Sequence, residues 1–154
     1  MGAWGPGIFE NDDAGDWVYA LEEDGAKAVD AAFNAALIGA ADGRLEATEG
    51  SCALAAAEAV AAAFGAPADG LDDEVKAVFD AHAEAIRGLQ DVQRRALMAA
   101  IAVLGQSPDG KEVASELAGL WGEDGVDEAD FQGFMAAVQN VAVRIKGTMT
   151  GGTA

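Results

Sequence analysis

One stretch of the chain, Ser51–Phe64, is almost wholly apolar, and this restricts what the rest can fold into. Most of its residues are alanine, which is the strongest helix former, so we expect a helix here. Glu58 is the only charged residue in it. A helix that is apolar nearly all round belongs in a protein interior. We therefore predict that other helices surround this segment and shield it from water.

The rest of the chain is typical of an all-α protein. Its 154 residues suit one domain with a hydrophobic core of its own. We predict a single-domain bundle of about six to seven helices around the central Ala-rich helix, with an extended N-terminal arm. The domain is expected to cover residues 1–147, and residues 148–154 to form a flexible tail. No alternating pattern predicts a strand.

Helix boundaries are indicated by caps, glycines and prolines. Asn11 is the predicted N-cap of the first helix, and Gly25 its end. Thr48 is expected to cap the central helix and Asp127 the last one, which should end at Gly147. The remaining helices are predicted at about residues 26–41, 72–85, 89–104 and 111–121. The last helix carries an apolar stripe from Phe131 to Ile145, with Arg144 in its final turn.

Charge restricts the classes of partner. The chain has 27 acidic and 9 basic residues, a net charge of -18. Such a chain repels phosphates, so we expect it to bind neither nucleic acid nor an anionic membrane surface. No segment is long and apolar enough to span a bilayer. The acidity fits either simple solubility, or a basic protein partner and nucleic-acid mimicry.

Cysteine and histidine are too few for several kinds of site. Cys52 and His82 are the single residues of their types, so a zinc site of nitrogen and sulfur ligands is not expected. His82 is predicted to be a hydrogen-bonded core residue. The start of the chain lacks a basic region followed by an apolar run, and the lone cysteine fits a reducing compartment. We therefore expect a cytoplasmic protein.

Two acidic turns resemble parts of calcium-binding loops. The turn at Asp42-Gly43, with Glu46 and Glu49, has only half of the oxygen ligands that an EF-hand needs, and the turn at Asp124–Asp127 also fails. We therefore expect neither a metal nor a cofactor. The basic residues Arg87, Arg94 and Arg95 are predicted to pair with carboxylates of the chain, and an anion or partner site is the alternative.

The N-terminal region supplies the candidate site residues. They are Trp4, Asn11, Asp12, Asp13 and Asp16. These residues could line a small polar pocket or contact a partner. In the structural interpretation, Asn11 caps a helix, the aromatic residues pack together and the aspartates are solvated.

The start of the chain also carries a pattern that points to a family. The pattern consists of Gly2, Trp4, Gly5, Gly7, Phe9, Asn11, Asp12, Ala14, Asp16 and Trp17. It resembles a bacterial family known as domain-of-unknown-function family 4259. Later blocks are similar too: Leu45–Ala47, Ala55–Ala63, and Ser115–Leu117 with Trp121. Gly15 and Thr48 depart from the family pattern. The resemblance implies a whole-domain unit and no known reaction or cofactor.

Three functional hypotheses remain. The first, which we favour, is a non-enzymatic protein-interaction module, regulatory or immunity/antitoxin-like, with a basic protein partner. It is motivated by strong negative charge without a catalytic set of residues. The second is a small-ligand binder or hydrolase-type enzyme that uses the acidic residues near Trp4 and Trp17. The third is a homodimer formed through an exposed helix face, with Phe131–Ile145 as the candidate.

Overall fold

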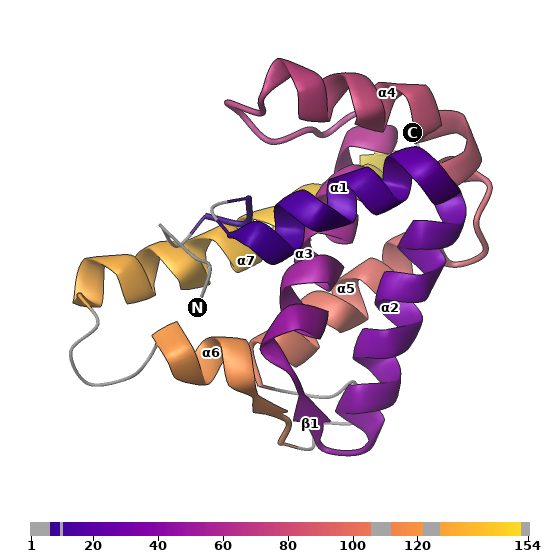
Figure 1. The fold of residues 1–154 in the computed structure, drawn as a ribbon. Helices are drawn as coiled ribbons and strands as arrows, with labels where there is room; N and C mark the ends of the chain where they lie inside the picture. Colours follow the sequence, from indigo (N-terminus) through magenta and orange to yellow (C-terminus); the bar gives the residue numbers. More distant parts are fainter. Residues whose placement is uncertain (1–6, 10, 106–111, 122–126, 152–154) are drawn as a thin grey trace.

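A computed structural model of the chain describes residues 7–9, 11–105, 112–121 and 127–151 (Figure 1). This part of the chain is all-α, as predicted, apart from two very short strands. The elements in chain order are α1 Asp12–Asp24, α2 Ala26–Ala41, β1 Arg44–Leu45, α3 Ala47–Ala63, α4 Asp73–Arg87, α5 Val92–Val103, β2 Ala114–Ser115, α6 Glu116–Trp121 and α7 Glu128–Gly151.

Helix α3 lies at the centre of the bundle (Figure 1). It contacts each of the six other helices. Its residues are buried on every side, including the run from Ala53 to Ala61. Alanine side chains allow close approach from all directions, and Gly50 lies against Leu117 of α6 and Val103 of α5. The prediction of a central, dry Ala-rich helix is confirmed.

The first two helices begin and end where the sequence indicates. The Asn11 side chain accepts a hydrogen bond from the Ala14 amide at 2.8 Å, which satisfies one of the free donors at the start of α1. Gly25 ends α1 with a φ of +67°, a conformation that a side chain would strain. α2 then follows at once, so α1 and α2 form a tight pair that contacts α3.

The apolar stripe of α7 faces the core. Phe134, Val138, Val141 and Ile145 are fully buried, and α7 contacts α3 and α5. This burial explains why the stripe is continuous. It also means that the stripe is not the exposed face that the homodimer hypothesis required. A homodimer would have to use another surface.

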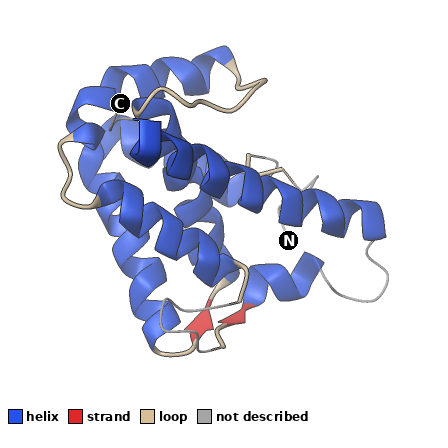
Figure 2. Cartoon of the chain, turned by 180° about the vertical axis from the view of Figure 1, so that it is seen from behind, coloured by secondary structure: helices blue, strands red, loops and turns tan. Residues whose placement is uncertain are grey.

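The two short strands were not predicted. β1 and β2 pair in parallel, with Arg44 beside Ala114 and Leu45 beside Ser115; both strands are red in Figure 2, next to α6. A two-residue strand is too short to show an alternating pattern. The helix predicted at 111–121 therefore begins only at Glu116. Residues 106–111 lie outside the described part of the chain.

The start of α3 also differs from the prediction. The helix begins at Ala47, so Thr48 lies inside it and is not its N-cap. The Ala47 amide donates to the Glu116 carboxylate of α6 at 3.0 Å, and the Glu46 amide donates to Glu49 at 3.3 Å. Carboxylates at a helix N-terminus are favourable because they meet unsatisfied amides and the positive end of the helix dipole.

Helix α7 is longer than predicted. It passes through Gly147 and continues to Gly151, so the expected helix end at Gly147 is wrong. Arg144 consequently lies inside the helix and not in its final turn. Thr148, placed in the tail by sequence, accepts a hydrogen bond from Gln93 of α5 at 3.0 Å. One turn beyond Gly147 therefore belongs to the packed body.

The described part of the N-terminal arm packs onto α4. The ring of Phe9 lies 6.0 Å from the ring of Phe79, and Ile8 is buried. α4 also places His82 beside Gly25, where the histidine is half-buried, so it is not the buried core residue that the sequence predicted.

None of the described helices has the length and apolar character needed to cross a membrane.

Candidate functional site

The structure describes four of the five predicted site residues. Trp4 lies outside the described residues. Asn11 serves as the cap of α1, Asp12 and Asp16 are exposed, and Asp13 is half-buried. The nearby Trp17 is buried, and its indole N–H donates to the Ala28 carbonyl of α2 at 3.2 Å.

Two of these aspartates belong to an exposed row on α1. Asp12, Asp16, Tyr19 and Glu23 are spaced by four, three and four residues, which places them on one face of a helix. All four are exposed, and Tyr19 is exposed to 70%. We call this row the α1 outer stripe. The opposite face of α1, from Ala14 to Leu21, is buried in the core. The stripe therefore presents an aromatic ring among carboxylates to solvent.

Cys52, on α3, lies against the first turn of α1. Its thiol is 3.9 Å from the backbone carbonyl oxygen of Asp13, to which it can donate. Burial, followed by the negative charges of Asp13 and Asp16, raises the pKa of the thiol to about 11. A thiol with so high a pKa is a poor nucleophile at neutral pH. Cys52 is therefore a weak candidate for covalent catalysis.

The central helix holds a buried ion pair. Glu58, only 4% exposed, binds Arg144 of α7 through two parallel hydrogen bonds, Nη1 to Oε1 at 2.9 Å and Nη2 to Oε2 at 2.7 Å. Arg144 makes two more hydrogen bonds, from Nη1 to the Ala66 carbonyl at 3.0 Å and from Nε to Asn140 Oδ1 at 2.7 Å. Four of its five N–H groups are therefore used.

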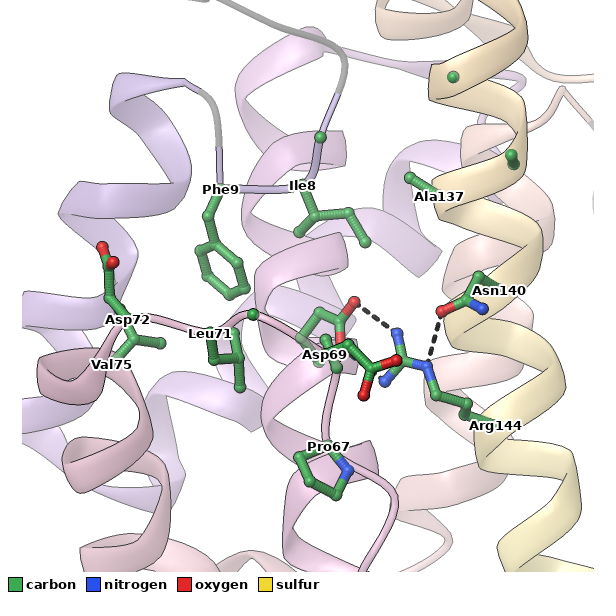
Figure 3. Close-up of a pocket in the computed structure, with 16 residues that line it drawn as sticks. Ile8, Phe9, Pro67, Asp69, Leu71, Asp72, Val75, Ala137, Asn140 and Arg144 are labelled. Carbon is green, nitrogen blue, oxygen red and sulfur yellow. Dashed lines mark hydrogen bonds and ion pairs between the residues drawn. The ribbon is translucent and has the colours of Figure 1, made fainter.

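A cavity of about 880 Å³ opens beside this ion pair. Figure 3 shows it between the N-terminal segment, the loop that leads to α4, and α7. Its apolar wall is formed mainly by Ile8, Phe9, Leu71 and Val75. Its polar wall holds Glu58, Arg144, Asn140, Asp69 and Asp72. This is the size of a small-molecule pocket, with an apolar side and a few placed polar groups.

Asp69 differs from the other charged residues of this cavity. It is exposed, and it has no hydrogen bond or ion pair with any described residue. In Figure 3 its carboxylate extends from the loop into the cavity, in front of the ion pair. The charge of Glu58 is balanced by Arg144, so the unbalanced charge of the cavity comes from Asp69 and Asp72.

The ion pair was missed by sequence reasoning, although one signal pointed to it. A charge inside an otherwise apolar buried helix needs a partner, so the position of Glu58 was a signal for a buried cation near it, and no such prediction was made. The sequence offered nine basic residues and no way to choose among them. Arg144 was assigned to a helix terminus because the end of α7 was placed too early.

The arginine cluster is largely used within the chain. Arg95 pairs with Asp30 of α2 at 2.6 Å, and Arg87 donates to the Ala63 carbonyl at 2.9 Å. Arg94 is exposed and lines a shallow hollow with Asp91. The predicted intramolecular pairing is therefore confirmed for Arg95. Among the described residues, no group of histidine, cysteine or carboxylate side chains could hold a metal ion.

The fold and cavity define an all-α protein with a buried ion pair at one side of a central Ala-rich helix. The chain belongs to the family described as "Domain of unknown function (DUF4259)", whose model matches residues 2–133. The match includes Glu58 and the loop with Asp69, whereas Asn140 and Arg144 lie beyond it. The chain matches no curated protein and no solved structure.

Proposed function

We propose that this protein is a non-enzymatic interaction module that binds a basic protein through the α1 outer stripe. The observation that carries the proposal is Tyr19, which is 70% exposed at the middle of the stripe. Tyrosine contributes strongly to many protein interfaces, because it buries a large rigid surface and can still hydrogen-bond. A largely exposed ring among Asp12, Asp16 and Glu23 suits a partner surface that is both apolar and basic.

Charge supports the same kind of partner. The sequence of α1 contains six acidic residues and no lysine or arginine. Arg95 and Arg144 are held by Asp30 and Glu58, so these cations are not available to neutralise α1. Opposite charge speeds encounter and selects the partner more than it sets affinity. The negative surface therefore favours a basic partner, and Tyr19 provides the contact that holds it.

The proposal extends to the biological role. A small acidic module that holds a basic protein suits a regulatory or immunity/antitoxin-like function, in which binding itself blocks or controls the partner. A cytoplasmic location and a bacterial host are part of the proposal. The unpaired Cys52 supports a reducing compartment.

The test is capture of a partner from extracts of the native host, with the purified protein as bait. We expect a stoichiometric protein with a basic isoelectric point. Its binding should weaken as salt increases from 0.05 to 0.5 M, roughly the range over which surface charges become screened. Tyr19→Ala should reduce the affinity about tenfold or more, as expected for an interface hot spot.

Ile38→Ala is the matched control, because Ile38 is exposed to a similar degree on α2, away from the stripe. It should leave the affinity unchanged. A partner that binds Tyr19→Ala and the wild type equally would refute the role of the stripe. Repeated captures without a stoichiometric basic protein would refute the interaction module itself.

A further inference from the structure

We infer that the cavity beside Glu58 and Arg144 binds a small primary amine with a short apolar body. The ammonium group would lie at Asp69, and the apolar body against Phe9 and Leu71. This site is separate from the α1 outer stripe. The inference therefore does not depend on the proposed protein partner.

The first argument is the shape and character of the cavity. Its volume of about 880 Å³ lies within the range of ligand pockets. Apolar side chains from three segments form one wall: Ile8 and Phe9 before α1, Leu71 and Val75 before and within the first turn of α4, and Ala137 on α7 (Figure 3). Against this wall the body of a ligand would exchange water for hydrocarbon contacts.

The second argument concerns which charge the cavity can accept. An anion would need Arg144, the arginine of the polar wall. Arg144 already gives both terminal nitrogens to Glu58 and its Nε to Asn140. Turning toward an anion would leave the buried Glu58 without a partner, which is costly. Only one N–H of Arg144 is left for an anion, and the carboxylates of Asp69 and Asp72 would repel it, so the cavity suits carboxylates and phosphates less well than cations.

A cation can bind in this cavity without breaking the ion pair. Asp69 is unpaired among the described residues and extends into the cavity, and Asp72 adds a second negative charge on the same loop. Asn140 contributes an amide oxygen, which the Arg144 Nε already uses. An ammonium group has three donors and no acceptor, and it can bind the Asp69 carboxylate without disturbing the ion pair.

The test compares three probes that share one apolar chain and differ only in charge: hexylammonium, hexanol and hexanoate. Their binding to the purified full chain is measured by two-dimensional NMR titration in 0.15 M salt, which screens the general attraction of an acidic surface for cations. We expect hexylammonium to bind at least tenfold more tightly than hexanol, with hexanoate weakest. The shifted signals should include Val75 and Ala137. Equal binding of all three, tightest binding of hexanoate, or no binding at 10 mM would overturn the inference.

Two variants locate the site. Asp69→Asn should weaken hexylammonium about tenfold, because a charged hydrogen bond is lost. Asp80→Asn removes the same charge from an exposed position of α4 outside the cavity, and it should change the affinity less than twofold. Ala136→Trp adds bulk from an exposed position of the lining, so it should abolish binding while the protein stays folded. If Asp69→Asn and Asp80→Asn weaken the binding of hexylammonium equally, the affinity depends only on the net charge of the protein and not on Asp69.

A last arm separates two sources of the ammonium group. A short peptide with one lysine is compared with the same peptide acetylated on that lysine. If hexylammonium binds and the peptide does not, the ligand is a free amine, as we infer. If the lysine peptide binds at least as tightly as hexylammonium and displaces it, the cavity is a lysine pocket for a protein, and the small-molecule inference is wrong. Neither result bears on Tyr19, which is tested separately.

Discussion

Glu58 and Arg144, 86 residues apart in the chain, form a two-pronged ion pair that joins the central helix to α7. The Arg144 side chain is 18% exposed and that of Glu58 is 5% exposed, so both charges are largely removed from water. Such a pair contributes little net stability, since desolvation offsets most of the attraction. Its larger effect appears when only one partner is removed.

We therefore predict that Arg144→Met destabilises the protein by about 3–5 kcal/mol, because it leaves the Glu58 carboxylate buried without a counter-charge. The free energy of unfolding is measured by urea denaturation. Replacing both residues, Glu58→Leu with Arg144→Met, should recover most of the loss. A double variant as unstable as the single one would show that packing around the pair, and not the unpaired charge, determines the cost.

The features of the fold that the sequence predicts correctly are those set by residues close together in the chain. The Ala-rich run alone indicated a central buried helix, because no other arrangement keeps so many apolar residues dry. Asn11, Gly25 and the stripe of α7 fixed their helices through local rules of capping and periodicity. These features depend on neighbours a few residues apart, and a sequence displays such neighbours directly.

Features formed by distant residues were not predictable in this way. The pairing of Arg44 with Ala114 and the binding of the Ala47 amide by Glu116 join segments about 70 residues apart. The cavity with Asp69 likewise depends on the meeting of three segments. An exposed aspartate in a loop looks like ordinary solubilising charge until the opposite wall is known.

We predict that replacing glycine by alanine lowers the free energy of unfolding at Gly39 and raises it at Gly15. At Gly39, near the end of α2, an added Cβ would lie 2.7 Å from the Arg44 carbonyl oxygen. That oxygen belongs to the backbone of β1 and cannot move freely. Gly39→Ala should therefore destabilise the protein by about 1–3 kcal/mol, which is the usual cost of overpacking. The measurement is again urea denaturation.

Gly15, at the end of the first turn of α1, is the matched position. A Cβ there meets nothing within 4 Å, and alanine favours the helix by about 0.5–1 kcal/mol over glycine. Gly15→Ala should raise the free energy of unfolding by about this amount. The substitution tests whether the only effect of this glycine is local weakening of α1. A loss of stability at Gly15 would contradict the described packing.

Asn11 separates a structural role of the N-terminal pattern from a functional one. Asn11→Ala removes the hydrogen bond to the Ala14 amide and should cost about 1 kcal/mol. Asn11→Asp keeps an acceptor at the cap but loses the donor that binds the Ile8 carbonyl at 3.1 Å, so it should restore part of that stability. If the cap is its main role, binding of the basic partner should change little in Asn11→Asp. A large loss of binding with normal stability would place Asn11 in the interface.

Cys52 should give the protein a pH-dependent reactivity and stability in the alkaline range. Burial, followed by the carboxylates of Asp13 and Asp16, raises the pKa of its thiol from 9.0 to about 11. The difference between 11 and 9.0 is two pH units, so at pH 8 the thiolate fraction is about a hundredfold below that of a free thiol. Reaction with a disulfide reagent should be slowed correspondingly and should accelerate up to pH 11.

The sign of the stability effect follows from the same shift. Because the pKa of Cys52 is higher in the folded chain than in the unfolded one, its contribution is complete below pH 9.0 and is lost as the pH rises through about 11. The free energy of unfolding should therefore decline over this interval, and less so in Cys52→Ala. Asp16→Asn should lower the pKa of the Cys52 thiol and speed its reaction at pH 8, because it removes a negative charge that opposes the thiolate. Asp16 is exposed, so the substitution should leave the packing unchanged. An unchanged rate would show that burial alone holds the thiol protonated.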